Sequence, residues 1–551
     1  MSQAVAPLKI PGFRALWVAS IFSNIGSFLQ AVAASWLMLE LTGSAAWVGL
    51  MNAASTLPLL FLALVAGAVA DLVDRRRLLL AAQVTMGSAA GAMAALTITG
   101  RITPTLLVGL GLLLGVGLAF NLPAWQATVP DLVPRGMIAS AVALNSVAFN
   151  VARAVGPAIG GALIATAGPG AGFALNAASY LGVVAVLAVL ARRMSVPDRA
   201  ETSMVNAIAN GVRFARYTPA FRRLLGLAAA FALTSASVQA VLPNRTTELG
   251  GGAAAYGFLL GAMGVGALVG AFTREPVTSR LGRRSVPFTV AGFGLAGVVL
   301  GLAPGVAVAL GALVVAGACW VWTLANLNAT AQLLSPEWVR GRSMGIYTLA
   351  FVGFLPLGSI LAGVVADRLG AGGAIALSSV GAVALGLVAP RLRIPALGEV
   401  VPPEFSGREP PEHVELEGGP VMVMNTWRVR PDDLEEFLDR IQEARLIRLR
   451  TGAYRWRLYR EAGDPFLLTE VFLVVSWEEH LAQHRRIDDR AAECLRDLRR
   501  FDVDGRPVTR HLVAVDLERP DHWELLVAEH ARLHATDGSI PLDDAVATDG
   551  G

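Results

Sequence analysis

Residues 103–126 read TPTLLVGLGLLLGVGLAFNLPAWQ, a stretch that contains no charged side chain. A helix needs about 20 consecutive, mostly apolar residues to cross the ~30 Å hydrocarbon core of a lipid bilayer. This stretch satisfies that requirement. It therefore predicts a membrane-spanning helix.

Runs of the same kind recur from Trp17 to about Pro390. Hydrophobic residues make up 54% of the 551-residue chain and charged residues 16%, whereas about a quarter of the residues in soluble globular proteins are charged. The runs predict twelve membrane-spanning helices, at 15–39, 46–70, 78–98, 103–126, 138–165, 171–191, 222–243, 254–273, 286–304, 307–332, 342–366 and 371–390. Charged residues become dense after Arg393, so we expect an all-α polytopic membrane domain followed by a soluble domain.

The arginines between the predicted helices are unevenly distributed. Alternate loops hold most of them, namely Arg75, Arg76, Arg77, Arg135, those between 192 and 223, Arg274, Arg280, Arg283, Arg284, Arg340 and Arg342. The remaining loops hold Arg101, Arg245 and Arg368. Because basic residues collect on cytoplasmic loops, this bias predicts that both termini are cytoplasmic. The same bias accounts for the basic pI of the chain, so we expect no nucleic-acid partner. The first run lacks a cleavage signal and is expected to remain as the first helix.

The two halves of the membrane domain resemble each other. Ala127-Thr128 and Pro134 match Ala329-Thr330 and Pro336 at one common offset, and Arg75-Arg76 correspond to Arg283-Arg284. Duplicated six-helix halves are typical of transporters, with the substrate site where the halves meet; the alternative is that Gly- and Ala-rich helices align by chance. The predicted domains are an N-terminal half (1–194), a cytoplasmic central loop (195–221), a C-terminal half (222–394), a linker (395–420), a soluble domain (421–518) and a flexible tail (519–551).

The loop after the second predicted helix carries a motif. Residues 67–77 read GAVADLVDRRR, which resembles the signature G-x-x-x-D-x-x-G-R-[KR] of the major facilitator superfamily. Gly67, Asp71, Arg75 and Arg76 match the signature, and Asp74 stands where the family usually has Gly. Asp71 could face the positive end of a helix, and Arg75 or Arg76 could pair with Asp131. Such contacts would form a latch between the halves; the alternative is that the arginines only enforce topology.

The fifth predicted helix contains a second motif, Gly156-Pro157-Ala-Ile-Gly160-Gly161. It resembles the G-P-x-x-G-G element of exporters in this superfamily and so implies export; the alternative is close helix packing, which glycine permits. Residues 13–17, 41–44 and 130–134 resemble the branch that contains the enterobactin exporter and the transmembrane secretion effectors. The resemblance covers about 10–395. It implies alternating-access export of a small siderophore- or drug-like molecule, driven by protons, across the inner (plasma) membrane of a bacterium.

In the superfamily, the first, fourth, seventh and tenth helices line the substrate cavity. These helices, with the fifth, carry polar residues that the resemblance makes candidate cavity residues: Asn24, Ser27, Gln30, Asn121, Trp125, Asn145, Arg153, Gln239, Asn326 and Thr330. Polar groups within a membrane are costly unless they face a cavity or one another. Hydrogen bonding between helices, without a role in substrate binding, is therefore the open alternative.

Arg153 is the charged residue well inside a predicted span. It could attract an anionic substrate or donate hydrogen bonds to carbonyl groups near Pro157. All seven histidines follow residue 412, so the membrane domain has no imidazole that could carry protons. Proton coupling is therefore implied only by the family resemblance, with Asp71 and Asp131 as the candidate proton carriers. The sequence shows no phosphate-binding loop, which argues against direct ATP drive.

The soluble segment predicts strands at 421–430, 454–461, 465–476 and 509–515, with helices at 431–450 and 477–500. This β-α-β-β-α-β order predicts a ferredoxin-like sandwich. It resembles the small dimeric fold of antibiotic-biosynthesis monooxygenases, which implies dimerisation through this domain. His480 and His484 lie one turn apart, but Glu479, Arg485 and Arg486 beside them favour a solvated face over a metal site. We expect no metal and no cofactor.

Three functions are compatible with these features. The favoured one is a secondary transporter of a small molecule, which is not an enzyme. The second is a membrane-anchored enzyme with a monooxygenase-like tail. The third is a sensor whose transporter-like domain moves no substrate.

Overall fold

The computed structural model describes residues 3–189, 204–395, 419–503, 505 and 507–515. The chain forms two compact units. The first is the membrane domain. The second joins the C-terminal domain to two short segments, 205–219 and 336–343. The predicted flexible tail (519–551) and most of the predicted linker (395–420) lie outside the described residues.

The membrane domain is built mainly from long apolar helices, together with two short ones of 7 and 13 residues. They are α1 (Pro11–Thr42), α2 (Ala45–Leu72), α3 (Arg75–Ile98), α4 (Pro104–Leu132), α5 (Ile138–Val189), α7 (Pro219–Ala240), α8 (Leu242–Glu248), α9 (Ala253–Leu281), α10 (Ser285–Leu302), α11 (Val306–Leu334), α12 (Arg340–Val352) and α13 (Phe354–Val388). Short 3₁₀ turns, among them Gly282–Arg284 and Ala389–Leu392, flank them.

These helices make twelve crossings. Within the described residues, nine helical stretches are long and apolar enough to span a membrane, and three of them run for 50, 50 and 53 residues. Each of these three turns back at a glycine with positive φ, at Gly168 (77°), Gly282 (50°) and Gly370 (76°), a conformation that glycine adopts without steric cost. Each long stretch therefore supplies two crossings, and the prediction of twelve helices is confirmed.

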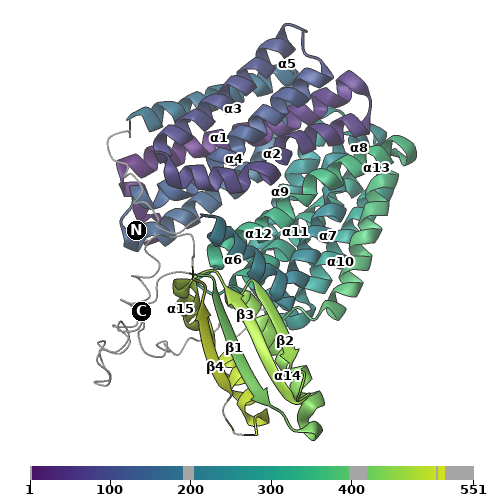
Figure 1. Ribbon diagram of the computed structural model, residues 1–551. Coiled ribbons are helices and arrows are strands. Elements are labelled where there is room, and N and C mark those ends of the chain that lie inside the picture. The colour runs from purple at the N-terminus through teal and green to yellow at the C-terminus, as the bar shows by residue number, and fades with distance from the viewer. Residues whose placement is uncertain (1–2, 190–203, 396–418, 504, 506, 516–551) are drawn as a thin grey trace. The chain divides into compact units, whose positions relative to one another are not determined.

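The crossings form two bundles of six. Figure 1 shows α1–α5, coloured purple to blue, in one bundle, and α7 to α13, coloured teal to green, in the other. The bundles meet where α5 packs on α9 and where α2 packs on α13. Because the number of crossings is even, α1 begins and α13 ends on the same side of the domain. We call this the terminus side, and the side where α1 ends and α2 begins the far side.

The predicted central loop (195–221) contains a helix that sequence reasoning missed. Residues Met204–Tyr217 form α6, and α7 begins at Pro219 rather than at 222. Asn210 and Phe214, four residues apart, are both buried, so one face of α6 is covered. An amphipathic face of this kind forms a helix within a loop that is otherwise rich in charge.

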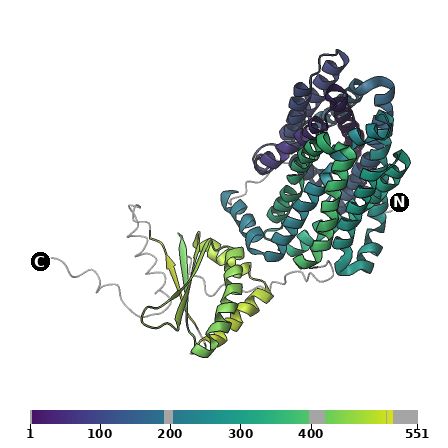
Figure 2. The ribbon, with the colours of Figure 1, turned by 90° about the vertical axis from the view of Figure 1, so that its right-hand side faces the viewer.

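The C-terminal domain has the predicted order of elements. Its strands are β1 (Val421–Arg428), β2 (Arg455–Arg460), β3 (Leu467–Val474) and β4 (Val508–Val513), and its helices are α14 (Leu434–Thr451), α15 (Trp477–Arg485) and α16 (Asp489–Asp497). The sheet order is β2-β3-β1-β4, and every neighbouring pair is antiparallel. This is the arrangement of a ferredoxin-like sandwich, and Figure 2 shows the helices on one face of the sheet.

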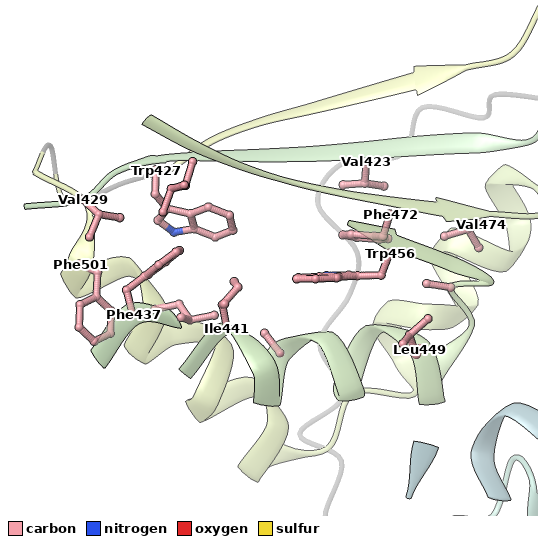
Figure 3. Packing of buried hydrophobic residues seen from close by; sticks show 14 of the residues in the cluster. Val423, Trp427, Val429, Phe437, Ile441, Leu449, Trp456, Phe472, Val474 and Phe501 are labelled. Atoms are coloured by element: carbon pink, nitrogen blue, oxygen red, sulfur yellow. The ribbon is translucent and has the colours of Figure 1, made fainter. Parts of the chain in front are cut away.

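The core of this domain lies between the sheet and its helices. Buried and partly buried residues alternate along β1, because successive strand residues point to opposite faces. The aromatic rings of Trp427, Phe437 and Phe501 pack together at one end of the core, as Figure 3 shows. Trp456 and Phe472 fill the other end.

The prediction of one helix over 477–500 is wrong. The helix breaks after Arg485, and α16 starts anew at Asp489. The reason is a cap, since the side chain of Asp488 accepts a hydrogen bond from the Ala491 backbone N–H at 2.7 Å. Asp at this position satisfies a helix N–H group that otherwise has no partner.

Candidate functional site

Several of the predicted cavity residues bind one another inside the N-terminal bundle. The Gln30 side chain accepts a hydrogen bond from the Asn176 amide at 2.5 Å, and Ser27 lies 3.3 Å from the Tyr180 hydroxyl. Asn121 accepts a hydrogen bond from Gln83 at 3.0 Å. Trp125 packs against the apolar cores of the same bundle. These residues thus make contacts between helices of one bundle, and their assignment to the substrate cavity stays a prediction.

The two candidates on α11 lie within the C-terminal bundle. The Asn326 carbonyl oxygen accepts a hydrogen bond from the Thr278 hydroxyl at 3.2 Å, and Thr330 donates to the Asn326 backbone oxygen at 2.8 Å. Both residues line a pocket at the terminus side, and all its lining residues belong to this bundle. They therefore lie away from the interface between the two halves.

Four candidates remain half-buried and, among the described residues, without a hydrogen-bond partner: Asn24, Asn145, Arg153 and Gln239. Arg153 has the clearest surroundings. Its guanidinium carbon lies 5.9 Å from the ring centroid of Trp320, which belongs to the other bundle. Within the described part of the chain, the indole N–H of Trp320 is buried and also lacks an acceptor.

Trp320 belongs to an aromatic cluster in the C-terminal bundle. Its ring lies 5.6 Å from that of Phe231, 5.7 Å from that of Phe293 and 5.8 Å from that of Phe351. These residues come from α7, α10, α11 and α12. Arg153 and Trp320 thus offer hydrogen-bond donors beside a cluster of aromatic rings. This combination suits a ligand that has acceptor oxygens and a flat ring. Sequence reasoning found Arg153 but missed Trp320, because nothing in the sequence brings the two residues together.

The glycines of the second motif are places of close helix contact. A Cβ added to Gly161 would lie 2.6 Å from Gly257 Cα, across the interface between α5 and α9. A Cβ at Gly156 would lie 2.8 Å from Phe28, and one at Gly160 would lie 3.1 Å from Leu29 Cα, both on α1. Pro157 is buried, and its carbonyl oxygen approaches Gly257. The motif therefore allows α5 to approach α1 and the opposite bundle closely.

A carboxylate joins the two halves on the far side. Asp367 of α13 accepts hydrogen bonds from the Ser44 hydroxyl at 2.8 Å and from the Ala45 backbone N–H at 2.7 Å. These groups form the N-terminus of α2, where negative charge is favoured. Close by, a Cβ at Gly363 would lie 2.8 Å from Ala46 Cα, so α2 and α13 are in tight contact there. Nothing in the sequence predicts this contact, because Asp367 stands next to Arg368 between two predicted helices and no motif marks it.

The first motif lies on the terminus side. The side chains of Asp71, Arg75 and Asp131 lie outside the described part of the structure, and so do the surroundings of Gly67. The latch that these residues would form therefore stays a prediction. The residue that departs from the family signature, Asp74, has a defined role. Its carboxylate accepts hydrogen bonds from the backbone N–H groups of Arg76 at 2.9 Å and Arg77 at 3.3 Å, which caps α3.

The prediction of a solvated face for His480 is wrong. His480 is 3% exposed, and its Nε2 lies 3.3 Å from the Nε2 of His484. Glu479 and Arg486 form an ion pair with a contact of 3.0 Å. Arg486 also lies over the Trp338 ring at 4.7 Å, and Glu479 accepts a hydrogen bond from Asn210 of α6 at 3.1 Å. These contacts cover the face that the charges alone would place in water.

Two bundles of six membrane helices that meet around polar and aromatic side chains define a membrane transporter. The chain belongs to the transmembrane secretion effector family, a branch of the major facilitator superfamily, because the family model matches residues 2–520. The match includes the C-terminal domain. The family and its named relatives are transporters, so this chain is a transporter rather than an enzyme.

The membrane domain is similar to curated exporters. The multidrug efflux pump Tap of Mycolicibacterium fortuitum is 28% identical over 68% of this chain and 95% of its own length. The enterobactin exporter EntS of Citrobacter koseri is 26% identical over 69% of this chain and 91% of its own length. Among solved structures, an inward-facing bacterial homologue of the human lysosomal transporter Spinster matches with a TM-score of 0.57 and 16% identity, over 70% of this chain and 98% of that one. This last likeness shows the fold alone.

Proposed function

We propose that this transporter exports a small organic molecule, siderophore- or drug-like, by alternating access of its two bundles in exchange for protons. The observation that carries the proposal is the pair of Arg153 and Trp320, which joins the two bundles with donor groups that have no acceptor among the described residues. The export function of two relatives supports the direction.

The substrate of this proposal carries acceptor oxygens and an aromatic ring. A carboxylate or catecholate would accept from the Arg153 guanidinium and the Trp320 indole N–H, and its ring would pack on Phe231 or Phe351. Asn24, Asn145 and Gln239 add polar contacts. Gln30, Ser27, Asn121 and Trp125 hold the helices of the N-terminal bundle in position beside it, and Asn326 and Thr330 stabilise the C-terminal bundle.

Both termini lie in the cytoplasm in this proposal, because the terminus side holds most of the loop arginines. The far side then faces out of the cell, and Asp367 on the N-terminus of α2 closes the transporter towards the exterior. When the pathway opens outward, Gly67, Asp71, Arg75, Arg76 and Asp131 form the opposing latch on the terminus side. Asp71 and Asp131 are the proposed proton carriers.

Transport into everted vesicles tests this function. When the vesicle interior is made more acidic than the medium, we expect uptake of a catecholate siderophore or an aromatic carboxylate drug. This uptake should be lost when an uncoupler collapses the proton gradient. Arg153→Ala should lower uptake at least tenfold, and Arg153→Lys should retain part of it because the charge remains. Arg101→Ala, in an exposed loop, is the matched control. Full uptake by Arg153→Ala would refute the site, and no gradient-dependent uptake across a broad panel would favour a sensor.

We also propose that the chain dimerises through its C-terminal domain. The face of the sheet opposite the helices holds partly buried Met422 and Met424, and Leu512 beside them is 50% exposed. Apolar side chains on an open sheet face gain stability when a second copy covers them. Mass photometry of the full-length protein should give a dimer that Met424→Glu converts to a monomer. A monomer at all concentrations would refute the dimer and leave the transport proposal intact.

A further inference from the structure

The pocket on the terminus side of the C-terminal bundle is separate from the interface between the halves. It lies where α7, α10, α11 and the turn after α13 end or begin, and it holds about 360 Å³. A single water needs only about 10–15 Å³ by this kind of measure. The pocket is therefore large enough for a polar group of several heavy atoms.

The lining of this pocket is strongly basic. Arg283 and Arg284 precede α10, and Arg393 follows α13. Among the residues that the structure describes, none of those lining the pocket is acidic. Three guanidinium groups around one cavity attract an anion, and a planar guanidinium pairs two of its N–H groups with phosphate or carboxylate oxygens.

Two further groups favour negative charge there. The first residues of the 18-residue helix α10, Ser285 to Pro287, line the pocket, and no side chain caps this helix. Its N-terminus therefore adds positive potential. Asn326 is fully buried, and its side-chain amide nitrogen has no acceptor among the described residues. An amide donor without a partner inside a pocket indicates an acceptor that is still to be supplied.

The surface beside the pocket is apolar. Phe288 follows the lining residue Pro287 and is 55% exposed, while Leu387 and Val388 precede the lining residue Ala389 and are 67% and 46% exposed. A free inorganic anion would gain nothing from these side chains. The acyl chains of a phospholipid would cover them, and basic pockets between membrane helices on one leaflet are suited to acidic headgroups.

We propose that this pocket binds a phosphate group, and that an acidic phospholipid of the adjoining leaflet presents it. Arg284 and Arg393 hold the phosphate, with Arg283 nearby, and the N-terminus of α10 adds its dipole. Phe288 and Leu387 contact the acyl chains. The site lies within one bundle, so it binds whether or not the transporter moves the substrate proposed above.

Binding to the purified full-length protein in detergent tests this site. Short-chain phosphatidylglycerol should raise the melting temperature saturably, whereas the same chain length of phosphatidylcholine should not. Arg284→Gln with Arg393→Gln should weaken the phosphatidylglycerol effect at least tenfold. The matched control is Arg280→Gln with Arg391→Gln, which removes the same charge from the same two segments outside the pocket lining.

The outcomes separate the sources of the phosphate. If sodium phosphate alone binds as tightly as phosphatidylglycerol, and the double variant abolishes both effects, the pocket binds phosphate but the lipid assignment is overturned. If the double variant and the control respond alike to phosphatidylglycerol, the attraction is general surface charge and the site is overturned. Neither result depends on transport, so the failure of this lipid site would leave the proposed transport function untouched.

Discussion

At the scale of single residues, the histidines of the C-terminal domain tie its stability to pH. Burial, followed by the charge of His484, lowers the pKa of His480 to about 3, and burial lowers the pKa of His484 to about 4. Both are neutral in the folded domain at pH 7, whereas in the unfolded chain they take up protons near pH 6.5. Between about pH 6.5 and 4, the unfolded state therefore binds more protons, and stability falls as the pH falls.

We expect acid to destabilise this domain by roughly 5 kcal/mol between pH 7 and 4.5 through these two side chains. His480→Gln with His484→Gln should flatten this dependence, because glutamine does not titrate. Scanning calorimetry of the full-length protein would record the melting temperature at each pH. Arg485→Gln, at an exposed position on the same helix, should keep the wild-type slope. Equal slopes in the double variant and the wild type would show that other groups set the pH dependence.

At the scale of helices, the contact between α5 and α9 depends on paired glycines. A side chain at Gly161 would collide with the backbone of Gly257, which cannot move without separating the two bundles. Gly161→Val should therefore either abolish transport or prevent the protein from folding. Gly182→Val is the matched control, because it lies on the same helix and a Cβ there meets nothing within 4 Å.

The comparison needs two measurements. Surface abundance in membranes reports folding, and flux per molecule reports movement of the bundles. We expect Gly161→Val to lose at least tenfold in flux per molecule and Gly182→Val to stay within twofold of wild type. A Gly161→Val protein with normal flux would show that the motif is not needed for closure.

The sequence predicted elements better than it predicted sites. Twelve crossings followed from run length, and the turns inside the three longest helical stretches lie at Gly168, Gly282 and Gly370, where the glycine backbone turns easily. Hydropathy does not tell which face of a helix a polar residue occupies, so Gln30 and Asn121 could not be separated from Arg153 in advance. Helix α6 was missed because it is short and lies in a charged loop. Trp320 and Asp367 gain their roles only from partners that are distant in sequence.

At the scale of the whole molecule, the two bundles are held together on the far side. Asp367 accepts a hydrogen bond at the N-terminus of α2. The Trp36 ring of α1 and the Tyr256 ring of α9 stack with their centroids 6.0 Å apart. Gly161 of α5 is in close contact with Gly257 of α9. Alternating access requires these contacts to break in the other state. The Asp367 contact is electrostatic and exposed, so one substitution can weaken it without disturbing the packing.

Asp367→Asn keeps the size of the side chain but removes its charge from the helix end, which costs about 0.5–1 kcal/mol. We expect the population open on the far side to rise about two- to fivefold. Spin labels at Leu41 and Leu302, exposed on the far side in opposite bundles, would report this as a larger long-distance fraction. Arg368→Gln, at the next exposed position, should leave the distances unchanged. If Asp367→Asn also leaves them unchanged, the glycine and aromatic contacts alone close the far side, and opening must begin by separating α5 from α9.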